Sequence, residues 1–169
     1  MKLIDTITNS DTWKSDLLCL SDAAISHALV ACAELVFPVA ECRQIRSLMP
    51  SIRRWTKFPD RDTSLLVESE VYRYIYNTGL FEAGGAQFFN LPTGRWPNVL
   101  EDTAVTFADD SVLYAANSIA TIGQQSFFGS AGRCLDYAEL SLQFCGFLAD
   151  KPFEKLLGEK LRQTKANDG

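Results

Sequence analysis

Hydrophobic residues between Glu101 and Phe128 recur at spacings of three and four, the period of an α-helix with one face packed against other helices. Alanines are also frequent in this stretch, so neighbouring helices can approach its backbone closely. We therefore expect residues 101–128 to form the central helix of the fold. The positions on its packed face are Val105, Ala108, Val112, Ala115, Ile119 and Ile122.

Two further stretches have the same helical period. Ser21 is placed to cap a helix whose apolar positions run from residue 25 to residue 36, and Pro38 is expected to end or kink it. The last long helix is expected over residues 133–149, after the glycines that follow the central helix. A short connection predicts that this last long helix and the central helix run antiparallel.

Polar residues and prolines predict the limits of the remaining helices. A short lead-in should precede a first helix capped by Ser10 or Asp11. A helix over residues 39–49 should end at Pro50, and residues 52–58 should form one more short helical turn.

After these prolines, a helix capped by Thr63 should stop near Asn77 and Gly79. A final amphipathic helix should then follow Pro152.

No stretch predicts a reliable β-strand. The fold class that we predict is all-α: a single, antiparallel, bundle-like helical domain of about six or seven helices over residues 1–162. Residues 163–169 are polar and are expected to form a frayed tail.

The one long irregular stretch, residues 79–98, contains several glycines and aromatic residues. Aromatic and arginine side chains are the residue types that anchor protein interfaces, and glycines let a loop conform to a partner. This composition predicts a partner-binding loop that uses Phe88, Phe89, Arg95 and Trp96. The alternative is that the aromatic side chains fold inward and close the open end of the helical bundle.

Charge is distributed unevenly along the chain. Its net charge is −5, yet residues 43–61 contain six cations and one carboxylate. This basic strip, with Arg53, Arg54 and Trp55 as its candidate partner-binding residues, could bind an acidic protein. An isoelectric point of about 4.9 disfavours nucleic acid as the main partner. The alternatives are a solvated helix face and pairing with the chain's own acidic helices.

Candidate catalytic and metal-binding residues are few. His27 is the only histidine and is expected at the surface. A single histidine is too few for most zinc sites. Asp109 and Asp110 are expected near the start of the central helix, where carboxylates stabilise the helix dipole. The alternative is that they form a magnesium site or an acid–base pair. We expect no metal and no cofactor.

Five cysteines without a CxxC pair indicate buried free thiols in a reducing compartment. The first residues lack a signal-peptide pattern, and the most apolar stretch, residues 23–40, is interrupted by His27, Glu34 and Pro38. We therefore expect a cytoplasmic protein that does not associate with a membrane.

In its general plan, over residues 23–42 and 101–149, the chain resembles bacterial immunity proteins that neutralise a cognate interbacterial toxin. The resemblance implies a non-enzymatic protein that binds and occludes a toxin, and it transfers no site residues. Two other function classes stay open, a metal-dependent helical hydrolase and a small-ligand-binding regulator. Self-association into a homodimer also stays open.

Overall fold

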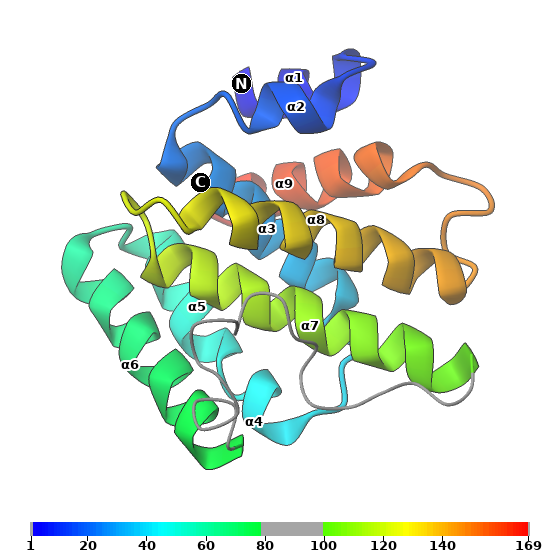
Figure 1. Cartoon of the computed structure of the whole chain (residues 1–169). Helices are drawn as coiled ribbons and strands as arrows, with labels where there is room; N and C mark the ends of the chain where they lie inside the picture. The colour runs from blue at the N-terminus through cyan, green and yellow to red at the C-terminus, as the bar shows by residue number, and fades with distance from the viewer. Residues whose placement is uncertain (1, 79–99, 169) are drawn as a thin grey trace.

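The computed structural model describes residues 2–78 and 100–168, with side chains for 2–74 and 103–164, and every regular element in these ranges is an α-helix (Figure 1). The all-α prediction is confirmed. The described ranges contain more helical segments than the six or seven expected, because short helices occur where the sequence predicted a lead-in or one continuous helix. They are α1 (Lys2–Asn9), α2 (Trp13–Leu17), α3 (Asp22–Val36), α4 (Arg43–Arg46), α5 (Met49–Lys57), α6 (Arg61–Thr78), α7 (Leu100–Ala120), α8 (Phe127–Phe144) and α9 (Phe153–Asp168).

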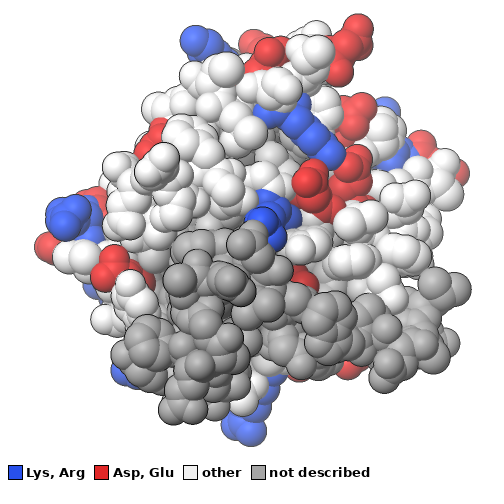
Figure 2. All heavy atoms as spheres, in the orientation of Figure 1, with Lys and Arg blue, Asp and Glu red and all other residues white. Residues whose placement is uncertain are grey.

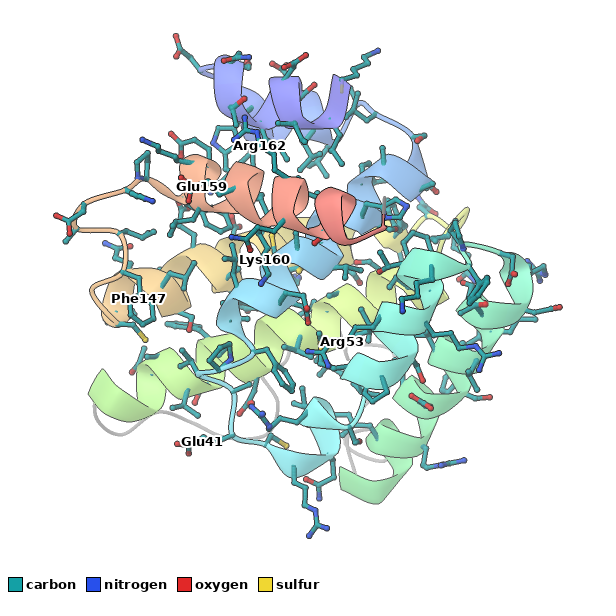
Figure 3. All side chains as sticks on the ribbon, turned by 180° about the vertical axis from the view of Figure 1, so that it is seen from behind. Glu41, Arg53, Phe147, Glu159, Lys160 and Arg162 are labelled. Carbon is teal, nitrogen blue, oxygen red and sulfur yellow. The ribbon has the colours of Figure 1, made fainter. Side chains whose placement is uncertain are left out.

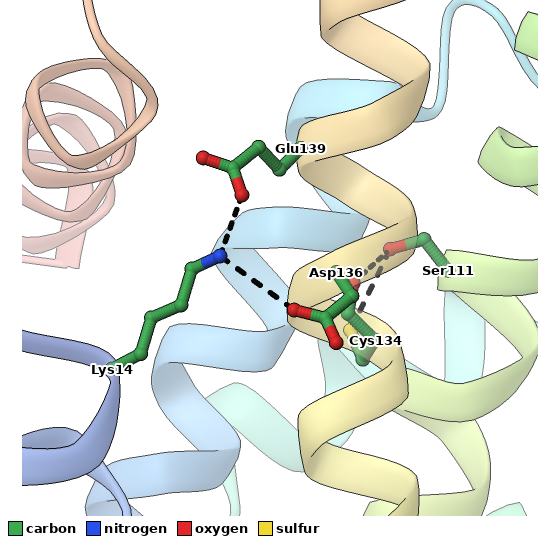
Figure 4. Close-up of polar contacts among 5 residues, drawn as sticks. All are labelled: Lys14, Ser111, Cys134, Asp136 and Glu139. Carbon is green, nitrogen blue, oxygen red and sulfur yellow. Dashed lines mark hydrogen bonds and ion pairs between the residues drawn. The ribbon is translucent and has the colours of Figure 1, made fainter.

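Helices α7 and α8 lie side by side and antiparallel, as the short connection predicted (Figure 1). The Ser141 hydroxyl donates to the carbonyl of Ala104 (2.8 Å), and the Ser111 hydroxyl donates to the carbonyl of Cys134 (2.9 Å; Figure 4). These bonds bring the backbones close, because all four residues are small. The facing alanines, also fully buried, are Ala108, Ala115, Ala131 and Ala138.

Helix α3 crosses behind this pair and contacts α7, α8 and α9 (Figure 1). The predicted cap is confirmed: the Ser21 hydroxyl accepts a 3.2 Å hydrogen bond from the backbone N–H of Ala24. Apolar residues surround α3 on most sides, and Leu29, Cys32 and Val36 are fully buried. It is therefore the second core helix beside α7.

The expected N-terminal lead-in is wrong, because residues 2–9 form helix α1. This helix packs Ile4 and Ile7 onto α9, and its two turns are too short to give a clear helical period. Ser10 does not cap α2; its hydroxyl donates to the carboxylate of Asp16. Tertiary packing, rather than a local cap signal, orders this end of the chain.

One proline and one helix cap act differently from the prediction. Pro50 lies in the first turn of α5 and starts this helix instead of ending the preceding one, since its missing N–H is not needed there. Asp60, rather than Thr63, caps α6. Its carboxylate accepts from both the backbone N–H and the hydroxyl of Thr63, each at 2.8 Å.

The last helices also differ in their limits. Helix α7 ends at Ala120, and the turn contains Gly123 with φ +84°, a left-handed conformation that suits glycine. Helix α8 then starts six residues earlier than predicted, so Gly129 and Gly132 lie inside it, and Gly146 with φ +79° follows its end. Helix α9 continues to Asp168, so the expected frayed tail is helical up to that residue.

Candidate partner-binding surface

Four of the candidate partner-binding residues, Phe88, Phe89, Arg95 and Trp96, lie outside the described residues. The partner-binding loop over residues 79–98 therefore stays a prediction. The basic strip, by contrast, lies entirely within the described residues and covers α4, α5, the turns that follow each of them and the first residue of α6.

Trp55 is part of the core rather than of the surface. Its side chain is 2% exposed, and its ring lies 4.9 Å from the ring of His27. A side chain with this burial cannot contact a partner without unfolding α5, so Trp55 is corrected from a binding residue to a packing residue. His27 is half-buried by the same contact, which places it against α5 instead of at an open surface.

Arg53 lies in an ordered setting on α5. Its Nε and Nη2 atoms donate to Glu34 Oε1 at 2.9 and 2.8 Å, and its guanidinium carbon lies 5.0 Å from the centre of the Phe37 ring. Arg46 is more strongly engaged, because its Nη1 donates to the carbonyls of Phe37 and Ala40 (2.7 Å each). Arg46 thus holds the chain that connects α3 to α4, whereas Arg53 is half-exposed.

Arg54 lies near the turn that joins α5 to α6. The hydrogen bonds from Thr63 lower the pKa of Asp60, and the charge of Arg54 lowers it further, which shows that Arg54 is close to this cap. Beside it, Phe58 is 58% exposed. Arg54, Lys57 and Arg61 are exposed and close to Phe58 in the sequence, and exposed aromatic and arginine side chains are typical of a surface that binds another protein.

The outer face of α6 extends this area. Its inner face buries Val67, Val71 and Tyr74. The large apolar side chains of Leu65, Leu66 and Tyr72 are exposed to solvent. Leu65 and Tyr72 are seven positions apart and therefore share one face of α6, whereas Leu66 is turned about 100° from Leu65 around the helix axis. We call the whole area the α5–α6 surface; its residues are Arg54, Lys57, Phe58, Arg61, Leu65, Leu66 and Tyr72.

A second feature is a groove of about 270 Å³ bordered by α3, α5 and α9, which shares Lys57 with the α5–α6 surface. Figure 3 shows Arg53 and Lys160 on the two sides of this groove, on α5 and α9. We call it the basic groove. Its residues are Val30, Glu34, Arg53, Thr56, Lys57, Lys160, Gln163 and Thr164.

Charges elsewhere are more evenly mixed. On the face drawn in Figure 2, the described Lys and Arg side chains that are visible lie among Asp and Glu side chains. Lys14 of α2, for example, contacts Glu139 and Asp136 of α8 at 2.5 and 3.6 Å (Figure 4). Burial alone would lower the pKa of Lys14, but the two carboxylates outweigh the effect of burial and raise this pKa. This cluster of one cation and two carboxylates attaches α2 to α8 and is net negative.

Asp109 does not lie at the start of the central helix. It occupies the middle of α7, is fully buried, and its Oδ1 accepts from the backbone N–H groups of Glu41 and Cys42 at 2.9 and 3.0 Å. The carboxylate thereby satisfies backbone donors at the start of α4. The helix-dipole interpretation is wrong, because helix α7 begins nine residues earlier.

Asp110 is also buried, beside aromatic side chains of α7 and α8. Desolvation raises the pKa of Tyr114 and of Tyr137, and the negative charge of Asp110 raises both further. The Tyr137 ring stacks on Phe107 at 5.6 Å and lies 5.7 Å from the Tyr114 ring. This arrangement is a packed interface between α7 and α8.

The described part of the chain contains no group of three or more His, Cys, Asp or Glu side chains that could hold a metal ion. Its helices also include none that is both long and apolar enough to span a bilayer. Comparisons with family models, curated proteins and solved structures gave no match for this chain.

The sequence pattern missed two contributors to these surfaces. Lys160 joins the basic groove from α9, more than 100 residues after Arg53, and only the tertiary fold brings them together. The exposed positions Leu65 and Tyr72 could have been found, because they lie on the opposite side of α6 from its buried stripe, and Leu66 lies on the flank between the two faces.

Proposed function

We propose that this protein is a non-enzymatic, cytoplasmic binding protein that occludes an acidic protein partner, in the manner of an immunity protein that inhibits a cognate toxin. The observation that carries the proposal is the α5–α6 surface, where an exposed phenylalanine and leucines are bordered by arginines and a lysine. Aromatic and arginine side chains supply most of the binding energy at protein interfaces.

Charge supports an acidic partner. The chain as a whole is acidic, yet the exposed residues around Phe58 in the sequence include Arg54, Lys57 and Arg61, against the carboxylates of Asp60 and Asp62. Positive charge at the rim of an apolar patch accelerates association with a negatively charged surface and disfavours other partners. Arg54 is thus retained as a partner-binding residue, and Arg53 supports the surface from the groove side of α5 through its contact with Glu34.

The alternative function, a metal-dependent hydrolase, relied on Asp109 as a metal ligand. It is less favoured, because Asp109 Oδ1 already accepts two backbone hydrogen bonds. A carboxylate held in this way supports the start of α4. The predicted loop residues Phe88, Phe89, Arg95 and Trp96 could extend the interface, and their part in it is tested separately from the described surface.

The test is affinity capture of the tagged protein from its source cells, followed by titration calorimetry with the captured partner. The variant Phe58→Ser/Arg54→Glu should weaken binding by about 30-fold or more. Phe147 is a matched control, because it is 57% exposed and lies far from Arg53 (Figure 3), so Phe147→Ser/Arg162→Glu should bind like the wild type.

Inhibition is tested with the same pair of variants. The captured partner should lose its own activity when wild-type protein is added and keep it with Phe58→Ser/Arg54→Glu. Equal effects of the two double variants would show that the α5–α6 surface is not the interface. A partner that stays fully active in the complex would reject the inhibitory role.

A further inference from the structure

We propose that the basic groove between α3, α5 and α9 binds the phosphate group of a small phosphorylated molecule. Three cations line the groove, Arg53 and Lys57 from α5 and Lys160 from α9, against the single carboxylate of Glu34. The excess of two positive charges matches a phosphate dianion. This inference does not rest on a protein partner at the α5–α6 surface.

The cations are available to a ligand. Among the described residues, neither Lys57 nor Lys160 forms an ion pair. The contacts that Arg53 makes with Glu34 engage Nε and Nη2, which leaves the N–H groups of Nη1 as donors for a further anion. Arginine combined with lysine is a common way to bind phosphate, since one presents a planar fork and the other a mobile point charge.

The site is partly built before a ligand enters. Glu34 and the Phe37 ring hold the guanidinium of Arg53, so less side-chain entropy is lost when a ligand binds. The Glu34 carboxylate also occupies the Nε and Nη2 donors of this guanidinium, which an anionic ligand would otherwise use. We therefore expect Glu34 to position Arg53 and, at the same time, to weaken anion binding through its own negative charge.

The groove has room for a small ligand. Its volume of about 270 Å³ accommodates a phosphate with a small substituent. Gln163 adds an amide donor at the wall, while the hydroxyls of Thr56 and Thr164 donate to carbonyls of their own helices.

The experiment is a titration of the full chain with inorganic phosphate and with glycerol phosphate at constant ionic strength, followed by NMR shifts and by thermal stabilisation. Lys160→Met and Lys57→Met should each weaken binding about tenfold, because each removes a charge-assisted hydrogen bond. Lys155→Met is the matched control on α9, since Lys155 is exposed and does not line the groove, and it should bind like the wild type.

Glu34→Gln separates a ligand site from a purely structural one, because it should tighten phosphate binding several-fold while the loss of the ion pair leaves the fold intact. The proposal is overturned if wild-type protein shows no saturable binding, if Lys155→Met loses as much affinity as Lys160→Met, or if Glu34→Gln binds more weakly. A phosphoserine peptide that binds at least about tenfold tighter than glycerol phosphate would assign the groove to a phosphoprotein and overturn the small-molecule assignment.

Discussion

Asp109 Oδ1, in the middle of α7, accepts a 3.0 Å hydrogen bond from the backbone N–H of Cys42, 67 residues earlier in the chain. The same oxygen accepts from Glu41, so one buried carboxylate satisfies two backbone donors where the chain enters α4. A residue that looked like a candidate metal ligand thus fixes a connection between helices, and its removal should affect stability first.

Asp109→Ala should lower the free energy of unfolding by about 2–4 kcal/mol, because two backbone N–H groups would lose their acceptor in a buried site. Asp109→Asn keeps an acceptor oxygen and should cost less. Urea denaturation followed by circular dichroism measures both variants. Asp136→Ala, an exposed control on α8, should stay within about 0.5 kcal/mol of the wild type. A small effect of Asp109→Ala would reject the proposed support of α4.

Trp55→Ala should destabilise the protein by about 3–5 kcal/mol, because the truncation leaves a cavity beside His27. The exposed neighbour Phe58 is the control, and Phe58→Ala should change stability by less than about 0.5 kcal/mol. Chemical denaturation of the two variants makes the comparison. If Trp55→Ala left stability unchanged but weakened partner binding, Trp55 would return to the interface.

The patterns that predicted the fold correctly are long ones. Helices α3 and α7 each show a helical period over at least fifteen residues, and their alanines indicated the close packing that the Ser111 and Ser141 bonds confirm. Helix α1 escaped prediction, because tertiary contacts with α9 stabilise it, and α4 is shorter than the helix predicted over residues 39–49.

Local signals were less reliable for the limits and for the site. A proline such as Pro50 can end one helix or start the next, and the sequence does not separate the two cases. Similarly, the basic strip was visible, but its burial pattern was not: Trp55 faces the core while its neighbours Arg54 and Phe58 face solvent. The sequence did not indicate that Lys160 lines the groove, because only the folded structure brings residues of α9 and α5 to the same groove.

Asp60 predicts a pH-dependent contribution to stability. The hydrogen bonds from Thr63 hold its pKa below the ordinary value of 3.8, so the cap stabilises the fold above that value. The contribution is lost as pH falls through the lower folded-state pKa, where the carboxylate becomes protonated. Asp60→Asn should therefore be less stable than the wild type at neutral pH, and the difference should shrink towards about pH 2. An equal difference at both pH values, measured by urea denaturation, would contradict this origin.

The five free cysteines should differ in reactivity. Burial raises the pKa of the Cys32 thiol well above its ordinary value of 9.0, and the neighbouring Cys134 raises it further. Because the thiolate is the reactive form, iodoacetamide should modify the exposed Cys19 long before Cys32 in native protein. Peptide mass spectrometry after timed quenching measures both rates, and urea should make them similar. Equal native rates would show that α3 and α8 open readily.

Gly158 of α9 lies against Thr8 of α1, and a Cβ atom added at this glycine would lie 2.6 Å from the Cγ2 methyl of Thr8. The methyl cannot turn away freely, because the Thr8 hydroxyl donates to the carbonyl of Ile4 at 2.8 Å. Gly158→Ala should therefore destabilise the wild-type protein, although alanine favours a helix by about 1 kcal/mol over glycine.

The same substitution should have the opposite sign in a Thr8→Ser background. Serine keeps the hydroxyl that bonds to Ile4 and removes only the methyl, so the added Cβ of Gly158→Ala meets no atom at 2.6 Å. Helix propensity then stabilises the double variant by up to about 1 kcal/mol relative to Thr8→Ser alone. A double-mutant cycle from thermal and urea denaturation of the four proteins gives the coupling directly. Additive effects at the two sites would show that α1 does not pack on α9 at this distance.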